Sequence, residues 1–235
     1  TGRLSVDNST FNSIQNGVII RETNSNFNGQ VMISTLEHQS IGLDVLAGVH
    51  NWAAVTIFKD FNHQDSESIA SQIWYADVTV KDFQALNYST GVKVRYGKLA
   101  AKSLFNYGGK ETAIHLISST IEADNLRTKY QNNGVLMTKQ SKMIIHDWVA
   151  ELHYEPLRLA NLSTAHILNF TTINTNPESG DAVGDGTLNY GSAQNLAIST
   201  SESHHFVVTE ITITDMSGNP VQAAIITNMF SFTSD

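Results

Sequence analysis

The stretch SKMIIHDWVAELHYEP, residues 141–156, is the best-specified element of the chain. With a period of two residues, one of its faces is almost entirely apolar or aromatic and the other is half polar. The first face carries Ile144, His146, Trp148, Ala150, Leu152 and Tyr154. Pro156 then ends the run, because proline has no N–H to donate to a neighbouring strand. This pattern is typical of a strand in the wall of a β-sandwich or barrel.

Similar alternation recurs along the chain and predicts further strands at 30–36, 50–58, 72–80 and 205–214. A turn between Asp215 and Pro220 and a return strand at 221–232 would complete a final hairpin. Residues 98–107 contain good helix formers followed by two glycines, which favours a short helix, with a short strand as the alternative. We therefore predict an all-β fold, an antiparallel β-sandwich or jelly-roll-like domain with one or two short helices.

The domain organisation is predicted from changes in composition. Residues 1–16 are polar and are expected to form an N-terminal arm, and residues 17–235 are expected to form a single β-rich domain. Within that domain, residues 174–203 are rich in Gly, Asp, Asn and Ser and predict a loop-rich excursion. Two internal similarities, 16–20 with 133–137 and 50–54 with 146–150, have unequal offsets. Shared composition between strands therefore explains them better than a duplication does.

Charge and composition exclude several classes of function. Only 15% of the residues are charged, against about 25% in a typical globular domain. The formal net charge is −8 with 14 Lys and Arg and no basic run, which argues against nucleic-acid binding. The absence of cysteine excludes disulfides and thiolate metal sites. No apolar run is long enough to span a membrane as a helix, so membrane insertion is not expected.

The stretch TDMSGNPV, residues 214–221, resembles a turn that is frequent in bacterial immunoglobulin-like surface repeats. Turn chemistry alone favours most of these residue types. The resemblance covers eight residues and implies an extracellular β-sandwich. Sequons for N-glycosylation at Asn8, Asn87, Asn161 and Asn169 are compatible with that location.

Two sets of residues are candidate ligands for a metal ion. Glu151, His153 and Glu155 lie at every second position of one predicted strand, so their side chains would point the same way, roughly 7 Å apart. Asp181 and Asp185 precede a glycine, as in part of a calcium loop, although the other ligand positions of that loop are missing. The alternatives are a solvated strand face and a plain loop. Calcium or another divalent ion is the one cofactor that the sequence suggests.

No catalytic signature accompanies these candidates. The chain lacks a nucleophile elbow, a phosphate-binding loop, a dinucleotide fingerprint and a zinc-protease helix, so no catalytic residues are assigned and no enzymatic activity is expected. Histidine lies two residues before tryptophan at His50 and at His146, a pairing that is more often structural than metal-binding. Exposed aromatic rings at Trp52, Trp74 and Tyr75 would suit a carbohydrate ligand.

The expected function is that of a non-enzymatic, self-assembling structural subunit, joined by exchange of an arm or strand between subunits. Such a subunit would belong to an extracellular filament, tube or surface layer, or to a virion, with other copies of itself as partners. A secreted carbohydrate- or metal-binding β-sandwich module is the first alternative, and a β-sandwich hydrolase or lyase is the second. The expected buried core contains Trp148, Ile144, Leu152, Trp52, Val78, Ile211 and Ile213.

Overall fold

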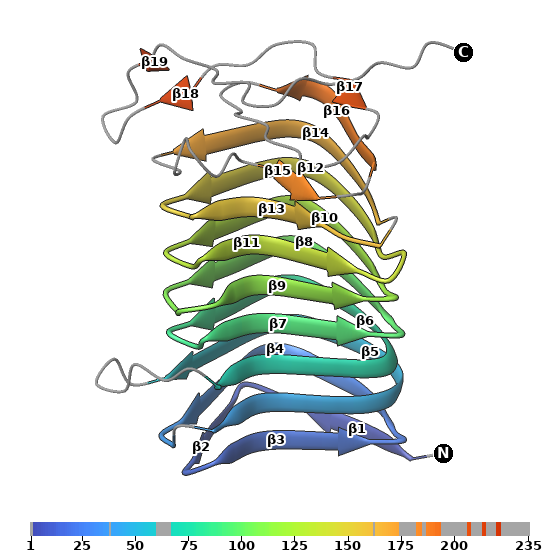
Figure 1. The fold of residues 1–235 in the computed structure, drawn as a ribbon. Helices are drawn as coiled ribbons and strands as arrows, with labels where there is room; N and C mark the ends of the chain where they lie inside the picture. The colour runs from blue at the N-terminus through green and yellow to red at the C-terminus, as the bar shows by residue number, and fades with distance from the viewer. Residues whose placement is uncertain are drawn as a thin grey trace.

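The computed structural model describes residues 2–37, 39–59, 67–161 and 163–173, and the backbone of the short segments 182–184, 187–193, 206–207, 213–214 and 220–221. These residues form strands connected by tight corners, and none of them is helical (Figure 1). The prediction of an all-β protein is confirmed. Residues 98–107, for which a short helix was favoured, form a strand instead.

The strands form a β-solenoid of about seven turns, in which the chain passes along two faces and stacks each turn on the previous one (Figure 1). The first face contains β3 (Asn16–Arg21), β7 (Thr90–Arg95), β9 (Thr112–Ile117), β11 (Asn133–Thr138), β13 (Glu155–Leu159) and β15 (Ala182–Gly184). The second face contains β4 (Asn24–Thr35), β8 (Lys98–Tyr107), β10 (Thr120–Lys129), β12 (Lys142–Glu151), β14 (Thr164–Ile173) and β16 (Thr187–Ala193). Two long strands, β5 (Ile41–Lys59) and β6 (Ile69–Leu86), run through both faces.

The predicted antiparallel sandwich or jelly roll is wrong, because neighbouring turns pair in parallel. Thr90 pairs with Thr112 and Thr112 with Asn133, so successive turns are offset by 22 and then 21 residues. Among the described strands, the antiparallel pair is β18 (Ile213–Thr214) with β19 (Pro220–Val221), which flank the predicted final turn. Alternation of apolar and polar residues occurs in parallel and antiparallel strands alike, so the alternation could not reveal the direction of pairing.

Small residues at the second position of β3, β5, β6, β7, β9 and β11 allow these turns to stack closely. This column contains Gly17, Gly42, Ala70, Gly91, Ala113 and Gly134. A Cβ added to Gly91 would lie 2.5 Å from the carbonyl oxygen of Ala113, and one added to Gly134 would lie 2.4 Å from that of Pro156. Both distances are below van der Waals contact. The backbones can therefore keep their spacing only with glycine at these two positions.

The corners of the solenoid repeat a second local feature, a residue with positive φ. At the corner after the first face these residues are Glu22, Ala47, Tyr75, Tyr96, Ser118, Lys139, Gln140 and Asn161, with φ between 49° and 58°. A buried serine follows this corner in three successive turns, at Ser119, Ser141 and Ser163. The amide of Ser119 donates to Ser141 Oγ at 3.3 Å, and the amide of Ser141 donates to Ser163 Oγ at 3.2 Å. This serine ladder satisfies backbone donors that the corner leaves without a strand partner.

The interior is a continuous apolar core, and it confirms part of the predicted set. Trp148, Trp52 and Val78 are buried, and Trp148 stacks on Phe170 at 4.3 Å between ring centroids. Ile144 is exposed, and Leu152 lies partly exposed at a corner, which corrects the prediction. Ile211 lies outside the described residues, and only the backbone of Ile213 is described.

The position of Ile144 differs from expectation because the alternation changes phase inside β12. His146 and Asp147 both point outward, so Met143 and Ile145 are buried before this point and Trp148 and Ala150 after it. The parallel pairing with β10 and β14 skips His146, which marks a local irregularity of the strand. A strict period of two therefore assigns the first half of β12 to the wrong face.

The residues predicted as an N-terminal arm are paired in the structure. β1 (Arg3–Val6) and β2 (Ser9–Ser13) both lie parallel to β4 and form the first turn. Parts of the predicted excursion also follow the solenoid, since β15 pairs with β13 and β16 with β14. The rest of 174–203 lies outside the described residues.

Candidate functional site

The predicted metal ligands Glu151, His153 and Glu155 do not share a strand face. β12 ends at Glu151, Leu152 has a φ of 57°, and β13 begins at Glu155. His153 therefore lies in the corner between two strands. The common direction of the three side chains, on which the metal prediction rested, is absent.

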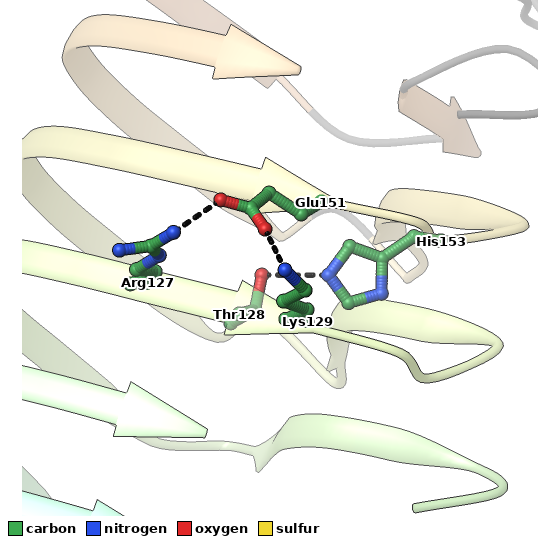
Figure 2. Close-up of polar contacts among 5 residues, drawn as sticks. All are labelled: Arg127, Thr128, Lys129, Glu151 and His153. Atoms are coloured by element: carbon green, nitrogen blue, oxygen red, sulfur yellow. Dashed lines mark hydrogen bonds and ion pairs between the residues drawn. The ribbon is translucent and has the colours of Figure 1, made fainter. Parts of the chain in front are cut away.

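Glu151 is engaged in a local ion-pair cluster (Figure 2). Its buried carboxylate contacts the Arg127 guanidinium and lies 2.6 Å from Lys129 Nζ, both on the adjacent strand β10. Burial on its own would raise the pKa of Glu151, but the hydrogen bonds from Lys129 and Arg127 outweigh it and lower the pKa. The carboxylate is thus held ionised between two cations, which offset part of the cost of burying its charge.

His153 is buried and both of its ring nitrogens are used; Figure 2 shows the contact with Thr128. Nδ1 donates to the carbonyl oxygen of Gln131 at 3.0 Å, and Nε2 lies 2.9 Å from Thr128 Oγ1. Thr128 Oγ1 also accepts a hydrogen bond from Trp148 Nε1 at 3.1 Å, so its own proton is directed to His153. Burial lowers the pKa of His153, which agrees with this neutral ring. The imidazole therefore has no nitrogen left for a metal ion.

The remaining metal candidates do not complete a site in the described residues. Glu155 pairs with Arg158 at 3.3 Å, three residues along the same strand. Asp181 and Asp185 lie outside the described residues, and their role as calcium ligands stays a prediction. Across the part of the chain with described side chains, no group of three or more His, Asp or Glu residues is arranged to hold a metal ion.

The two His-x-Trp pairs occupy different environments. His50 is buried, and its Nδ1 lies 2.8 Å from Ser25 Oγ, which also accepts a hydrogen bond from Trp52 Nε1. The side chain of His146 instead lies on the outer surface of the solenoid, beside Asp147. Burial lowers the pKa of His50, as expected for a neutral ring within the core. The structural interpretation of the first pair is thus confirmed.

A shallow groove of about 870 Å³ crosses the outer surface of the second face. It runs over β6, β8, β10, β12 and β14, so its walls are built by residues from five successive turns. The polar lining includes Thr79, Lys81, Lys102, Glu122, Asp124, His146 and His166, with Ile144 and Leu168 as exposed apolar residues. Lys98 crosses between turns to Glu122 at 2.7 Å. Because these residues are about one turn apart in sequence, strand alternation alone does not bring them together.

A second surface feature, here named the aromatic cluster, comprises Trp74, Tyr75, Arg95 and Tyr96. The rings of Tyr75 and Tyr96 stack with centroids 5.0 Å apart, and the Arg95 guanidinium lies 5.1 Å from the rings of both Trp74 and Tyr96. Of the three aromatic residues considered from the sequence, Trp52 is buried, Trp74 is half-buried and Tyr75 is exposed. The stacked pair was not predicted, because Tyr96 reaches Tyr75 only through the parallel register.

The buried ionisable side chains described above are occupied by structural contacts, whereas the groove and the aromatic cluster present polar and aromatic groups to solvent. None of the described residues belongs to a helix with the length and apolar character needed to span a membrane. No protein-family model, curated protein or solved structure shows significant similarity to this chain.

Proposed function

We propose that the chain is a non-enzymatic structural subunit that assembles by continuing its stacked strands from one copy to the next. The observation that carries this proposal is the edge formed by the first turn. Among the described strands, β1 and β2 pair with β4, and β3 pairs with β5, all toward the same end of the solenoid. No described strand pairs with their other side, which faces away from the coil at the bottom of the stack in Figure 1.

The side chains of this edge favour association. An edge strand offers a row of backbone donors and acceptors, and natural proteins usually protect it with charges, proline or a covering segment. Between residues 3 and 20 the chain has two charged residues, Arg3 and Asp7, and no proline. Ile14 and Ile19 are 64% and 51% exposed beside this edge.

The proposed partner is another copy of the chain. Strand addition would supply backbone hydrogen bonds, and the side-chain columns of the two copies would set the register. This contact replaces the exchanged arm expected from the sequence, because β1 and β2 already pair with β4 of their own chain. An end-to-end contact that repeats gives filaments, tubes or layers, for which we propose a cell-surface or virion location.

The experiment compares the full chain with an edge variant. Ile14→Lys combined with Ile19→Lys replaces two exposed apolar side chains beside the edge by charges, which protect natural sheet edges from pairing, so size-exclusion chromatography with light scattering should show loss of large assemblies. Val49→Lys is the matched control, because Val49 is 53% exposed on β5 but away from the edge. Negative-stain imaging would show whether wild-type particles are ordered.

A wild-type protein that stays monomeric at high concentration would contradict the proposal, as would undiminished assembly of the double variant. Deleting residues 1–14 is a poorer test. That deletion removes β1 and β2 and so turns β4 into a new open edge. A second candidate function, carbohydrate binding, is favoured by the aromatic cluster and is developed next.

A further inference from the structure

We propose that the aromatic cluster binds an acidic polysaccharide, with a sugar ring stacked on Tyr75 and a sugar carboxylate paired with Arg95. The inference does not depend on self-assembly, because the cluster lies on β6, on β7 and at the corner directly after β7, away from the first turn. It is carried by three observations: the exposure and backbone conformation of the tyrosines, the open face of their stack, and a cation that has no carboxylate partner in the part of the chain that the structure describes.

Two exposed tyrosines occupy a position where the fold does not require them. Tyr75 and Tyr96 are 58% and 38% exposed, and both have positive φ, 52° and 54°. A bulky side chain is disfavoured in this backbone region. The same corner accepts Ala47 and Ser118 in the turns before and after. Residues held in a disfavoured backbone conformation cluster at binding and active sites.

The stack leaves one ring face open. The parallel register places Ala47 beside Tyr75 on the side away from Tyr96. A methyl side chain is too short to cover a phenol ring, so the outer face of Tyr75 is open to solvent. The ring of Tyr96, by contrast, has the Arg95 guanidinium above it. The apolar C–H face of a sugar ring can pack on an open aromatic face, as bases stack on aromatic residues in single-strand binding proteins.

Arg95 supplies a charge that no carboxylate among the described residues neutralises. Arg21, Arg127 and Arg158 are each paired with a carboxylate, whereas Arg95 is in no ion pair among the described residues. Its Nε and the indole Nε1 of Trp74 are buried without an acceptor. A buried donor without an acceptor is costly, and a ligand oxygen reached by a small movement of the Arg95 side chain would relieve that cost.

The surrounding charges select an acidic ligand. Lys93 lies two residues before Arg95 on the same face of β7, about 7 Å away along the strand, and it too is in no ion pair among the described residues. Two cations that pair with no described carboxylate, beside an aromatic surface and on a chain of net charge −8, form a local anion site. A uronic-acid polymer combines the two features required, an apolar ring face and a carboxylate on each sugar.

The test is isothermal titration calorimetry of the full chain with oligogalacturonate, and with the same oligomer after complete methyl esterification of its carboxylates. The acidic oligomer should bind, and its affinity should fall with added salt. Tyr75→Ala and Arg95→Gln should each weaken binding about tenfold, the scale of one stacking or one desolvated cation contact. Arg95→Lys keeps the charge but loses the forked pair of N–H donors. Its affinity should lie between those of the wild type and Arg95→Gln.

Tyr130→Ala is the matched control, because Tyr130 is also a corner tyrosine with positive φ, 61°, and is 43% exposed, but it lies at the opposite corner. It should bind like the wild type, and circular dichroism should show that all variants are folded. Absence of binding to the acidic oligomer at millimolar concentration would overturn the proposal. Equal binding of the esterified oligomer, unchanged affinity of Tyr75→Ala, or tighter binding of a single-stranded oligodeoxynucleotide would overturn it too.

Discussion

Replacing Ser141 by alanine tests whether the serine ladder holds neighbouring turns together. Ser141 is 1% exposed, and its Oγ accepts the amide of Ser119 at 3.3 Å and donates to the carbonyl oxygen of Thr138 at 2.6 Å. Alanine keeps the backbone and most of the volume but leaves the Ser119 N–H without its acceptor. Ser119 is itself 5% exposed, so water cannot readily replace the lost oxygen.

The expected cost follows from that single unsatisfied donor. A buried polar group without a partner costs about 1–3 kcal/mol, so Ser141→Ala should lower the free energy of unfolding by that amount. Urea unfolding followed by tryptophan fluorescence would measure the change as a lower midpoint at constant slope. Ser5→Ala is the control, because the Ser5 hydroxyl bonds to Asn28 at the surface, and its loss should cost less than about 0.5 kcal/mol.

Ser163→Ala should resemble Ser141→Ala, because Ser163 Oγ accepts the Ser141 amide and donates to the carbonyl oxygen of Ala160 in the same way. A Ser141→Ala change no larger than that of Ser5→Ala would refute the reasoning. It would mean that the corner amides find other acceptors and that the ladder does not stabilise the stack.

Two further predictions concern the core and the response to acid. Trp148→Ala should cost about 3–5 kcal/mol in the same urea assay, because the indole stacks on Phe170 and bonds to Thr128; a change within error would show that this ring is not core. Burial, and secondarily the charge of Lys93, lower the pKa of His115 to about 4, so the unfolded state binds its proton first as pH falls. Stability should therefore be lost between about pH 6.5 and 4, by about 2 kcal/mol after allowance for solvent screening. His115→Gln should remove that part of the pH dependence of the unfolding midpoint, and an unchanged pH profile would contradict the assignment.

The repeat was visible in the sequence but has a short and degenerate form. The segments GVII at 17–20, GLDV at 42–45, GVKV at 91–94 and GVLM at 134–137 share a small residue followed by alternating apolar residues. The similarity between 16–20 and 133–137 is a structural equivalence, since the parallel register connects Asn16 to Asn133 through five turns. Steps between equivalent residues vary from 21 to 28 positions, and this variation hides the regular period in the sequence.

The segments 50–54 and 146–150 also resemble each other, but they do not occupy equivalent positions in the solenoid. The register connects His50 with Met143, not with His146. The two His-x-Trp pairs therefore occupy different columns, one in the core and one at the outward irregularity of β12. Two short segments that resemble each other can be recognised as structurally equivalent only when the period of the repeat is already known.

The sequence by itself determined the local properties of this protein: extended strands, the burial of Trp148, Trp52 and Val78, and a surface with few charges. These properties depend on residues close in the chain. The tertiary structure alone decided that the strands pair in parallel, that a corner separates Glu151 from Glu155, and that Tyr75 stacks on Tyr96. Side-chain alternation has a period of two in either pairing direction, so it carries no information on which turns meet. Residues 21 or 22 positions apart become neighbours only when stacking sets the register, and every candidate site on this surface is built from such neighbours.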